Sequence, residues 1–232
     1  MSDRSILSGI ADELAADYRV INVDLRGYGA SDVADSYVCS DFVDDLHALL
    51  KRLNAPRPTL LGWSMGGLIA QSFAVRHPEA VGRLILLATT PCLVQRPDWE
   101  AGVSPEQAQG LLELLISDWQ LGADAFADMV VNEPGQDSAR ERVAALARSA
   151  RSQVNLTCFQ TMGGEDIRSS ISAISAPVHV IGGSDDLLCP AGASRFIAEQ
   201  TGGTLAIIPG AGHAPFLTAP AEVHKLIRAA LS

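Results

Sequence analysis

The chain has 232 residues and a formal net charge of −10, with 17 Lys and Arg against 27 Asp and Glu. Its apolar content of 47% and charged content of 19% are those of a globular protein, which excludes a disordered chain. The acidic balance disfavours nucleic acid as a partner, no apolar run is long enough to cross a membrane, and the front of the chain does not resemble a signal peptide. The four cysteines are scattered without a CxxC pair, so we expect no metal site, no disulfide framework and a cytoplasmic location.

Strands and helices alternate over the first 90 residues. Apolar positions that recur at three- and four-residue spacing predict helices at residues 6–14, 42–50 and 65–76. Short runs of β-branched and other apolar residues predict strands at residues 19–24, 59–63 and 83–88. This alternation predicts an α/β fold whose parallel sheet is covered on both faces.

The alternation stops in the middle of the chain. Between residues 91 and 172 the pattern is helical, with helices expected at residues 111–116, 123–131 and 140–152. It then resumes with strands at 178–181 and 204–208 and with helices at 191–200 and 221–231. We therefore expect a core formed by residues 1–90 and 174–232, with a helical cap, residues 91–173, inserted into it.

The segment Gly62-Trp63-Ser64-Met65-Gly66 matches G-x-S-x-G at an expected strand-to-helix junction. A nucleophilic serine there must stand on a sharp turn, and Gly62, Gly66 and Gly67 leave room for that turn. The helix that follows directs free N–H groups at the site, so the Met65 N–H is the expected donor to an oxyanion.

A serine nucleophile needs a histidine base, which a carboxylate must orient. His213 is the only histidine expected on a loop at the carboxyl end of a strand, where ligands of open α/β sheets bind. The acid is expected after the strand at 178–181, where Asp185 and Asp186 compete. We prefer Asp186, because turn residues precede it, and Asp185 stays open as the alternative.

Four motifs in this order resemble the α/β-hydrolase superfamily over the full length of the chain: DLRGYGAS at 24–31, GWSMGG at 62–67, GGSDDLLCP at 182–190 and GAGHAPF at 210–216. Within the superfamily, the elbow, the TPC and RPDW stretches near residues 90–99 and the HAPF segment are similar to the pimeloyl-[acyl-carrier protein] methyl ester esterases of biotin synthesis. The resemblance implies a triad of Ser64, Asp186 and His213, an oxyanion donor at Met65 and an acyl-chain pocket under the cap. It also implies substrate contacts from Trp63, Met65 and Phe126.

The same resemblance implies an acidic acyl carrier protein as a partner, docked on basic residues of the cap. Arg140, Arg148 and Arg151 fall within roughly 80° of one another on an ideal helix. We expect them to form the docking surface; the alternative is an ordinary solvated helix face.

The resemblance departs from the family at the front of the chain. Family members place three strands and a His-Gly loop, the source of the second oxyanion donor, before the first helix, whereas this chain begins at that helix. The resemblance therefore predicts a gap in the sheet between the strands expected at 19–24 and 59–63. Either the given start lies downstream of the true one, which we prefer, or the chain is a shortened variant.

The function expected from these residues is a serine carboxylesterase that acts without metal or cofactor on a small-molecule or carrier-linked ester. Two alternatives stay open. One is an enol-lactone or carbon–carbon bond hydrolase with the same triad, and the other is a non-catalytic ligand-binding protein on a hydrolase fold.

Overall fold

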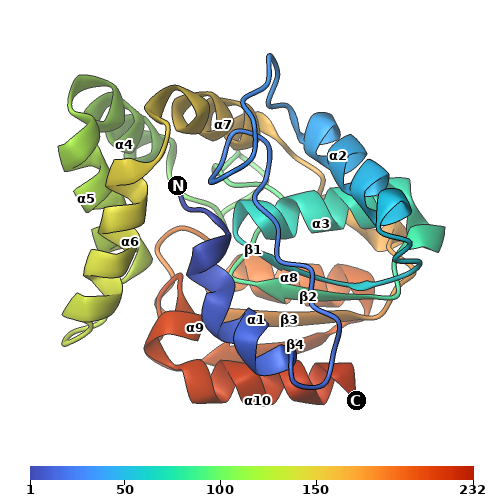
Figure 1. Ribbon diagram of the computed structural model, residues 1–232. Helices are drawn as coiled ribbons and strands as arrows, with labels where there is room; N and C mark the ends of the chain where they lie inside the picture. Colours follow the sequence, from blue (N-terminus) through green and yellow to red (C-terminus); the bar gives the residue numbers. More distant parts are fainter.

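The computed structural model describes residues 1–232 and contains one four-stranded parallel sheet (Figure 1). The strands lie side by side in chain order: β1 (Thr59–Trp63), β2 (Arg83–Leu87), β3 (Val178–Gly183) and β4 (Thr204–Ile208). Because all three pairings are parallel, the carboxyl ends of the four strands meet at one edge of the sheet.

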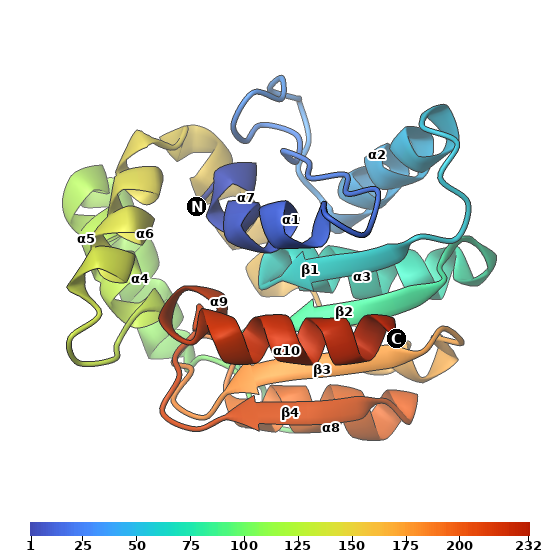
Figure 2. The ribbon, with the colours of Figure 1, turned by 60° about the horizontal axis from the view of Figure 1, so that its bottom comes forward.

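Helices cover both faces of the sheet (Figure 2). One face carries α2 (Cys39–Arg52), α3 (Met65–Arg76) and α8 (Ala191–Thr201), and the other carries α1 (Ser8–Leu14) and α10 (Pro220–Leu231). The apolar residues of β2 supply both layers in turn, since side chains alternate along a strand. Leu84 and Leu86 pack in the first layer, whereas Ile85 and Leu87 pack in the second. The short elements are η1 (Arg4–Leu7), η2 (Pro78–Ala80), η3 (Ile171–Ala173) and α9 (Pro215–Thr218).

Four helices and no strand lie between β2 and β3, namely α4 (Pro105–Ser117), α5 (Trp119–Val130), α6 (Asp137–Ser149) and α7 (Ser152–Gly164). Helices α4, α5 and α6 stand beyond the carboxyl ends of the strands (Figures 1 and 2). Helix α7 instead packs on the core, where Val154, Cys158 and Met162 join the apolar cluster of α2 and α3. The cap boundaries at residues 91 and 173 stay a prediction.

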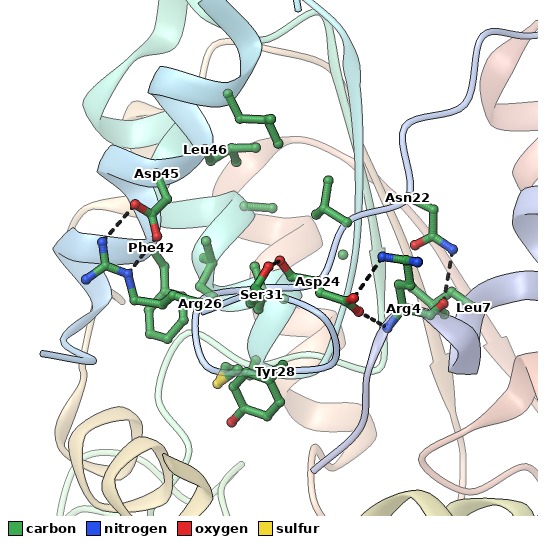
Figure 3. Close-up of a pocket in the computed structure, with 18 of the residues that line it drawn as sticks. Arg4, Leu7, Asn22, Asp24, Arg26, Tyr28, Ser31, Phe42, Asp45 and Leu46 are labelled. Atoms are coloured by element: carbon green, nitrogen blue, oxygen red, sulfur yellow. Dashed lines mark hydrogen bonds and ion pairs between the residues drawn. The ribbon is translucent and has the colours of Figure 1, made fainter. Parts of the chain in front are cut away.

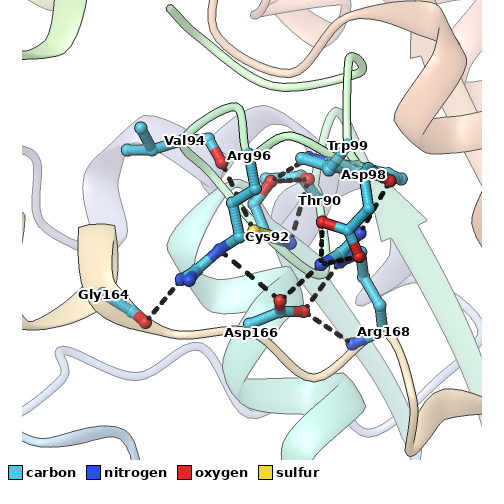
Figure 4. A network of polar contacts seen from close by, with 9 residues as sticks. All are labelled: Thr90, Cys92, Val94, Arg96, Asp98, Trp99, Gly164, Asp166 and Arg168. Carbon is cyan, nitrogen blue, oxygen red and sulfur yellow. Dashed lines mark hydrogen bonds and ion pairs between the residues drawn. The ribbon is translucent and has the colours of Figure 1, made fainter. Parts of the chain in front are cut away.

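A polar network ties together the two chain segments that lead into and out of these helices (Figure 4). Asp166 lies 2.7 Å from the Arg168 guanidinium and 3.5 Å from that of Arg96, and Arg168 also pairs with Asp98 at 3.2 Å. The Arg168 guanidinium lowers the pKa of the Asp166 carboxyl. A backbone bridge between Cys92 and Asp166 adds a direct link. The network therefore ties the segment before α4 to the segment after α7.

The strand expected at residues 19–24 is absent. These residues form no backbone hydrogen bond with any other backbone group, and β1 pairs only with β2. A cavity of about 800 Å³ is lined both by residues 21–25 and by β1 (Figure 3). Residues 19–24 therefore have no neighbouring strand with which their backbone could form hydrogen bonds. Pairing between distant segments decides whether a β-branched run becomes a strand, which explains why the strand predicted from the local pattern is wrong.

The helix expected at residues 140–152 is also corrected. Helix α6 ends at Ser149, and Arg151 has an extended backbone, with φ −67° and ψ 105°, at the start of α7. No helix in the chain combines the length and the apolar character that crossing a membrane requires.

Candidate active site

Ser64 stands on the turn between β1 and α3, with φ 53° and ψ −121°. A positive φ at a non-glycine residue costs about 1–3 kcal/mol, which the surrounding contacts must offset. The Ser64 N–H donates to the Leu87 carbonyl at 3.1 Å, and the Thr89 hydroxyl donates to the Ser64 carbonyl at 2.7 Å. These two bonds fix the turn from the neighbouring strand, and they leave the side chain of Ser64 at the head of α3.

Close packing explains two of the three glycines around this turn. A Cβ on Gly62 would lie 2.5 Å from the Gly66 carbonyl oxygen, and a Cβ on Gly67 would lie 2.6 Å from the Thr89 side chain. A Cβ on Gly66 would meet nothing within 4 Å. The expectation of room for a sharp turn therefore applies to Gly62 and Gly67, whereas Gly66 is not required by space.

His213 and Asp186 form a buried pair at the same edge of the sheet. Nδ1 of His213 lies 2.9 Å from Oδ2 and 3.0 Å from Oδ1 of Asp186, and the two residues are only 1% and 5% exposed. Oδ1 of Asp186 also accepts the N–H groups of Leu188 at 2.9 Å and Cys189 at 2.8 Å. The carboxylate is thus held in place by its own loop and aimed at the imidazole.

The neighbouring Asp185 points elsewhere. Its Oδ1 accepts the hydroxyl of Ser184 at 2.7 Å, and the side chain makes no contact with His213. Cys189, next to the Asp186 carboxylate, stays a neutral thiol because burial, and then the Asp186 charge, raise its pKa well above the usual value. Of the groups on this loop, Asp186 alone is placed to orient the histidine.

The second ring nitrogen of His213, Nε2, is buried and has no hydrogen-bond partner. The structure therefore does not show a hydrogen bond between Ser64 Oγ and His213. Catalytic hydrogen bonds are often long in unliganded enzymes and tighten once substrate is bound. Because Nε2 has no other partner, it is free to accept the proton of a reacting hydroxyl.

The residues expected to contact substrate lie around the cavity that Ser64 lines. Trp63, Met65 and Phe126 of α5 all contribute to its wall. The indole of Trp63 has a further contact, because its Nε1–H donates to the His213 carbonyl at 2.8 Å and its ring lies 5.4 Å from the imidazole. Trp63 thus supports the histidine as well as the cavity.

Figure 3 shows the polar wall of this cavity, where Asp24 and Arg26 each hold a charged partner. Asp24 accepts the backbone N–H of Arg4 at 2.7 Å and pairs with its guanidinium at 2.9 Å. Arg26 pairs with Asp45 at 2.6 Å, and this bond raises the pKa of the guanidinium. The charges of Asp24 and Arg26 are therefore paired within the protein.

The three arginines expected to form a docking stripe do not form a free cationic surface. Arg140 pairs with Asp137 at 2.6 Å and with Asp128 at 3.3 Å. Arg148 pairs with Asp124 at 2.6 Å and with Glu141 at 2.9 Å. Arg151 lies outside α6 and donates to the carbonyls of residues 27 and 31 at 2.8 and 2.9 Å. Carboxylates on α5 and α6 pair with Arg140 and Arg148, and the end of α6 at Ser149 takes Arg151 off that helix.

The contacts between the cap and the histidine loop are not predicted by the sequence pattern. Glu133, just after α5, accepts the Gly212 N–H at 2.7 Å, and Asn132 donates to the Asp185 carbonyl at 3.0 Å. Both partners lie more than 50 residues away in the chain, and the only local signal was a polar turn after a helix. No group of three or more His, Cys, Asp or Glu side chains lies close enough together to hold a metal ion.

Comparison with known proteins places these features in context. The model of the alpha/beta hydrolase family matches residues 4–226. A pimeloyl-[acyl-carrier protein] methyl ester esterase of Nitrosomonas europaea is 31% identical over 228 residues, which cover 94% of this chain and 86% of that protein. A protein of the same name from Aeromonas hydrophila is 28% identical over 232 residues, covering 96% and 89%. An esterase structure from Exiguobacterium antarcticum is similar in fold, with a TM-score of 0.93 at 24% identity over 100% of this chain and 88% of that one.

Proposed function

Because this chain belongs to the alpha/beta hydrolase family and is a carboxylic ester hydrolase, we propose that it acts through an acyl-enzyme on Ser64. The observation that carries the proposal is the buried Asp186–His213 pair at 2.9 Å, at the sheet edge where Ser64 heads α3. A non-catalytic binding protein would have no need of a strained serine, an unpartnered Nε2 and a buried carboxylate together.

In the proposed mechanism, Ser64 Oγ attacks the ester carbonyl carbon while His213 Nε2 takes the hydroxyl proton. Asp186 accepts the Nδ1–H, so it keeps Nε2 free as the base and stabilises the imidazolium that forms. The proton then passes from Nε2 to the alkoxy oxygen as the C–O bond breaks, and the alcohol leaves. Water attacks the acyl-enzyme with His213 again as base, which releases the acid and restores Ser64.

The Met65 N–H is the proposed donor to the oxyanion. It follows the nucleophile and lies in the first turn of α3, where backbone N–H groups have no partner within the helix. The positive end of the helix dipole adds to its effect on a developing negative charge. The donor is therefore preorganised before substrate binds.

The test of the proposal is a direct search for the acyl-enzyme. The full chain is mixed with a panel of p-nitrophenyl esters, methyl esters and lactones, quenched within the first turnover and analysed by intact mass and peptide mapping. We expect a mass increase equal to the acyl group on the peptide that contains Ser64. Ester turnover with acylation at another residue, or with none, would contradict the proposal, and turnover of lactones alone would favour the lactone-hydrolase alternative.

We further propose that the substrate is a methyl ester whose acyl chain is carried by an acyl carrier protein. The support is that the two relatives from Nitrosomonas europaea and Aeromonas hydrophila, which align with nearly all of this chain, are named pimeloyl-[acyl-carrier protein] methyl ester esterase. Of the three arginines, Arg148 is the proposed docking contact, because Arg140 and Arg151 donate to backbone carbonyls of this protein. The side chain of Arg148 is 33% exposed, and its guanidinium lies between two carboxylates.

Replacing Arg148 with alanine removes this cation and leaves Asp124 and Glu141 facing an acidic carrier. We expect KM for a carrier-linked ester to rise about 2- to 5-fold, which is the scale of one exposed charge contact, while KM for a small p-nitrophenyl ester stays unchanged. Arg76→Ala is the matched control, since Arg76 pairs with Asp44 at 3.0 Å away from the cap. An equal change on both substrates would rule out Arg148 as a carrier contact.

A further inference from the structure

The segment that follows helix α5 of the cap contacts both loops of the proposed catalytic pair. The His213 N–H donates to the Val130 carbonyl at 3.1 Å, and the preceding Gly212 N–H donates to Glu133 Oε1 at 2.7 Å. On the acid loop, the Asp185 carbonyl accepts the side-chain amide of Asn132 at 3.0 Å. One short piece of the cap therefore holds the backbone on either side of the Asp186–His213 contact.

Glu133 makes two of the hydrogen bonds that join this segment to the core. Its Oε1 accepts two donors, the Gly212 N–H and the Thr218 hydroxyl at 2.8 Å, while Oε2 is buried without a partner. One donor belongs to the histidine loop and the other to α9, so Glu133 joins the cap to both.

The fit between the two segments is close. A Cβ on Gly212 would overlap Asn132 Oδ1, and it would lie 3.0 Å from Glu133 Oε2 and 3.2 Å from the Val130 carbonyl. Only a glycine lets the loop approach the cap this closely. The backbone before His213 is therefore in close contact with the cap.

Arg140 supports the same segment. Its guanidinium donates to the carbonyls of Val131 at 3.0 Å and Glu133 at 3.3 Å. The residue expected from the sequence as a docking contact thus stiffens the turn that presents Glu133.

We propose that Glu133 is a positioning residue, which fixes the Gly212–His213 backbone so that the imidazole stays against Asp186 with Nε2 directed at Ser64. This inference rests on the proposed function of His213 as the base. Besides its hydrogen bonds with Asp186 and Trp63, His213 is held by the bond from its N–H to the Val130 carbonyl of the cap. The position of the cap and the position of the His213 imidazole are then coupled through Glu133.

The test compares three substitutions of Glu133 with one matched control. Glu133→Ala removes the acceptor, Glu133→Asp keeps the charge but withdraws it by one methylene, and Glu133→Gln keeps an acceptor oxygen at full reach. Glu141→Ala is the control, since Glu141 is a cap carboxylate that pairs with Arg148 and does not contact the histidine loop. Ester hydrolysis gives kcat and KM, and thermal unfolding gives the stability of each variant.

We expect Glu133→Ala and Glu133→Asp to lower kcat about 10- to 100-fold, the scale of a misplacement near 1 Å, with KM for a small ester unchanged. Glu133→Gln and Glu141→Ala should stay close to the unsubstituted protein. A normal kcat in Glu133→Asp would overturn the proposal. So would an equal loss in the Ala, Asp and Gln variants that follows a common loss of thermal stability.

A spectroscopic measurement separates this inference from the proposed function. The Nδ1–H that His213 shares with Asp186 should give a low-field proton resonance, which Glu133→Ala and Glu133→Asp are expected to broaden or shift and Glu133→Gln to preserve. The resonance does not depend on turnover. If the unsubstituted protein hydrolyses no ester, the proposed function fails while the resonance still tests the contact; an unchanged resonance in all variants overturns the positioning role.

Discussion

Replacing Ser64 with alanine should lower ester turnover by about 10⁴- to 10⁶-fold and abolish covalent labelling by a fluorophosphonate. The substitution removes the oxygen that we propose forms the acyl-enzyme, while the backbone turn, with φ 53°, is held by bonds to Leu87 and Thr89 that do not involve the side chain. The protein is therefore expected to stay folded. Steady-state hydrolysis and intact mass after labelling measure the two effects.

Ser149→Ala is the control for this experiment. The Ser149 hydroxyl donates only to the Leu146 carbonyl three residues earlier, on the cap helix α6. The control should keep full turnover and full labelling. If Ser64→Ala kept either turnover or labelling, the nucleophile would have to be another residue.

Replacing Asp186 with asparagine should lower kcat about 10⁴-fold, with little change in KM for a small ester. The asparagine can still accept the N–H groups of Leu188 and Cys189 through its oxygen, so the loop keeps its shape. Its amide would present an N–H where Oδ2 now accepts from His213 Nδ1 at 2.9 Å, which favours the tautomer with a proton on Nε2. A histidine in that tautomer cannot take the proton of Ser64.

Asp185→Asn makes the same chemical change one residue earlier. Because Asp185 contacts Ser184 and not His213, we expect kcat to stay within about twofold, the scale of an ordinary surface substitution. The ratio of the two variants assigns the acid by experiment. Equal losses in both, or a larger loss in Asp185→Asn, would contradict the role of Asp186.

The parts of the site that depend on local backbone could be predicted from the sequence. The turn at Ser64 needs a strand, a helix and close-fitting glycines within a few residues, and all are visible in residues 59–76. His213 could be placed because it follows a strand on a loop. The sequence leaves both Asp185 and Asp186 open, because adjacent residues in one turn differ only in the direction of their side chains. That direction depends on contacts with residues distant in the chain, such as the contact between Asp186 and His213, 27 residues away.

The parts that depend on distant partners could not be predicted. Residues 19–24 have the composition of a strand but no neighbour to pair with, so the local pattern gave the wrong element. Two partners of the arginines, Asp137 and Glu141, lie on α6 itself, but Asp124, which pairs with Arg148, lies 24 residues away on α5 and could not be foreseen. The contact of Glu133 with the histidine loop could not be predicted for the same reason, since its partner Gly212 is 79 residues away in the chain.

The place of the cap in the chain has a consequence for how the protein folds. In the pairings β1–β2 and β3–β4, residues about 25 apart come together, as for Leu60 with Leu84 and Val180 with Leu205. The pairing β2–β3 joins Leu84 to Val178, so the whole cap lies within that loop. The longer closure costs about 1 kcal/mol more in chain entropy, and non-local contacts slow folding. We therefore expect two short β–α–β units to form early and the join between β2 and β3 to form late, so that the edge of the sheet bearing Ser64, Asp186 and His213 is completed only at the end of folding.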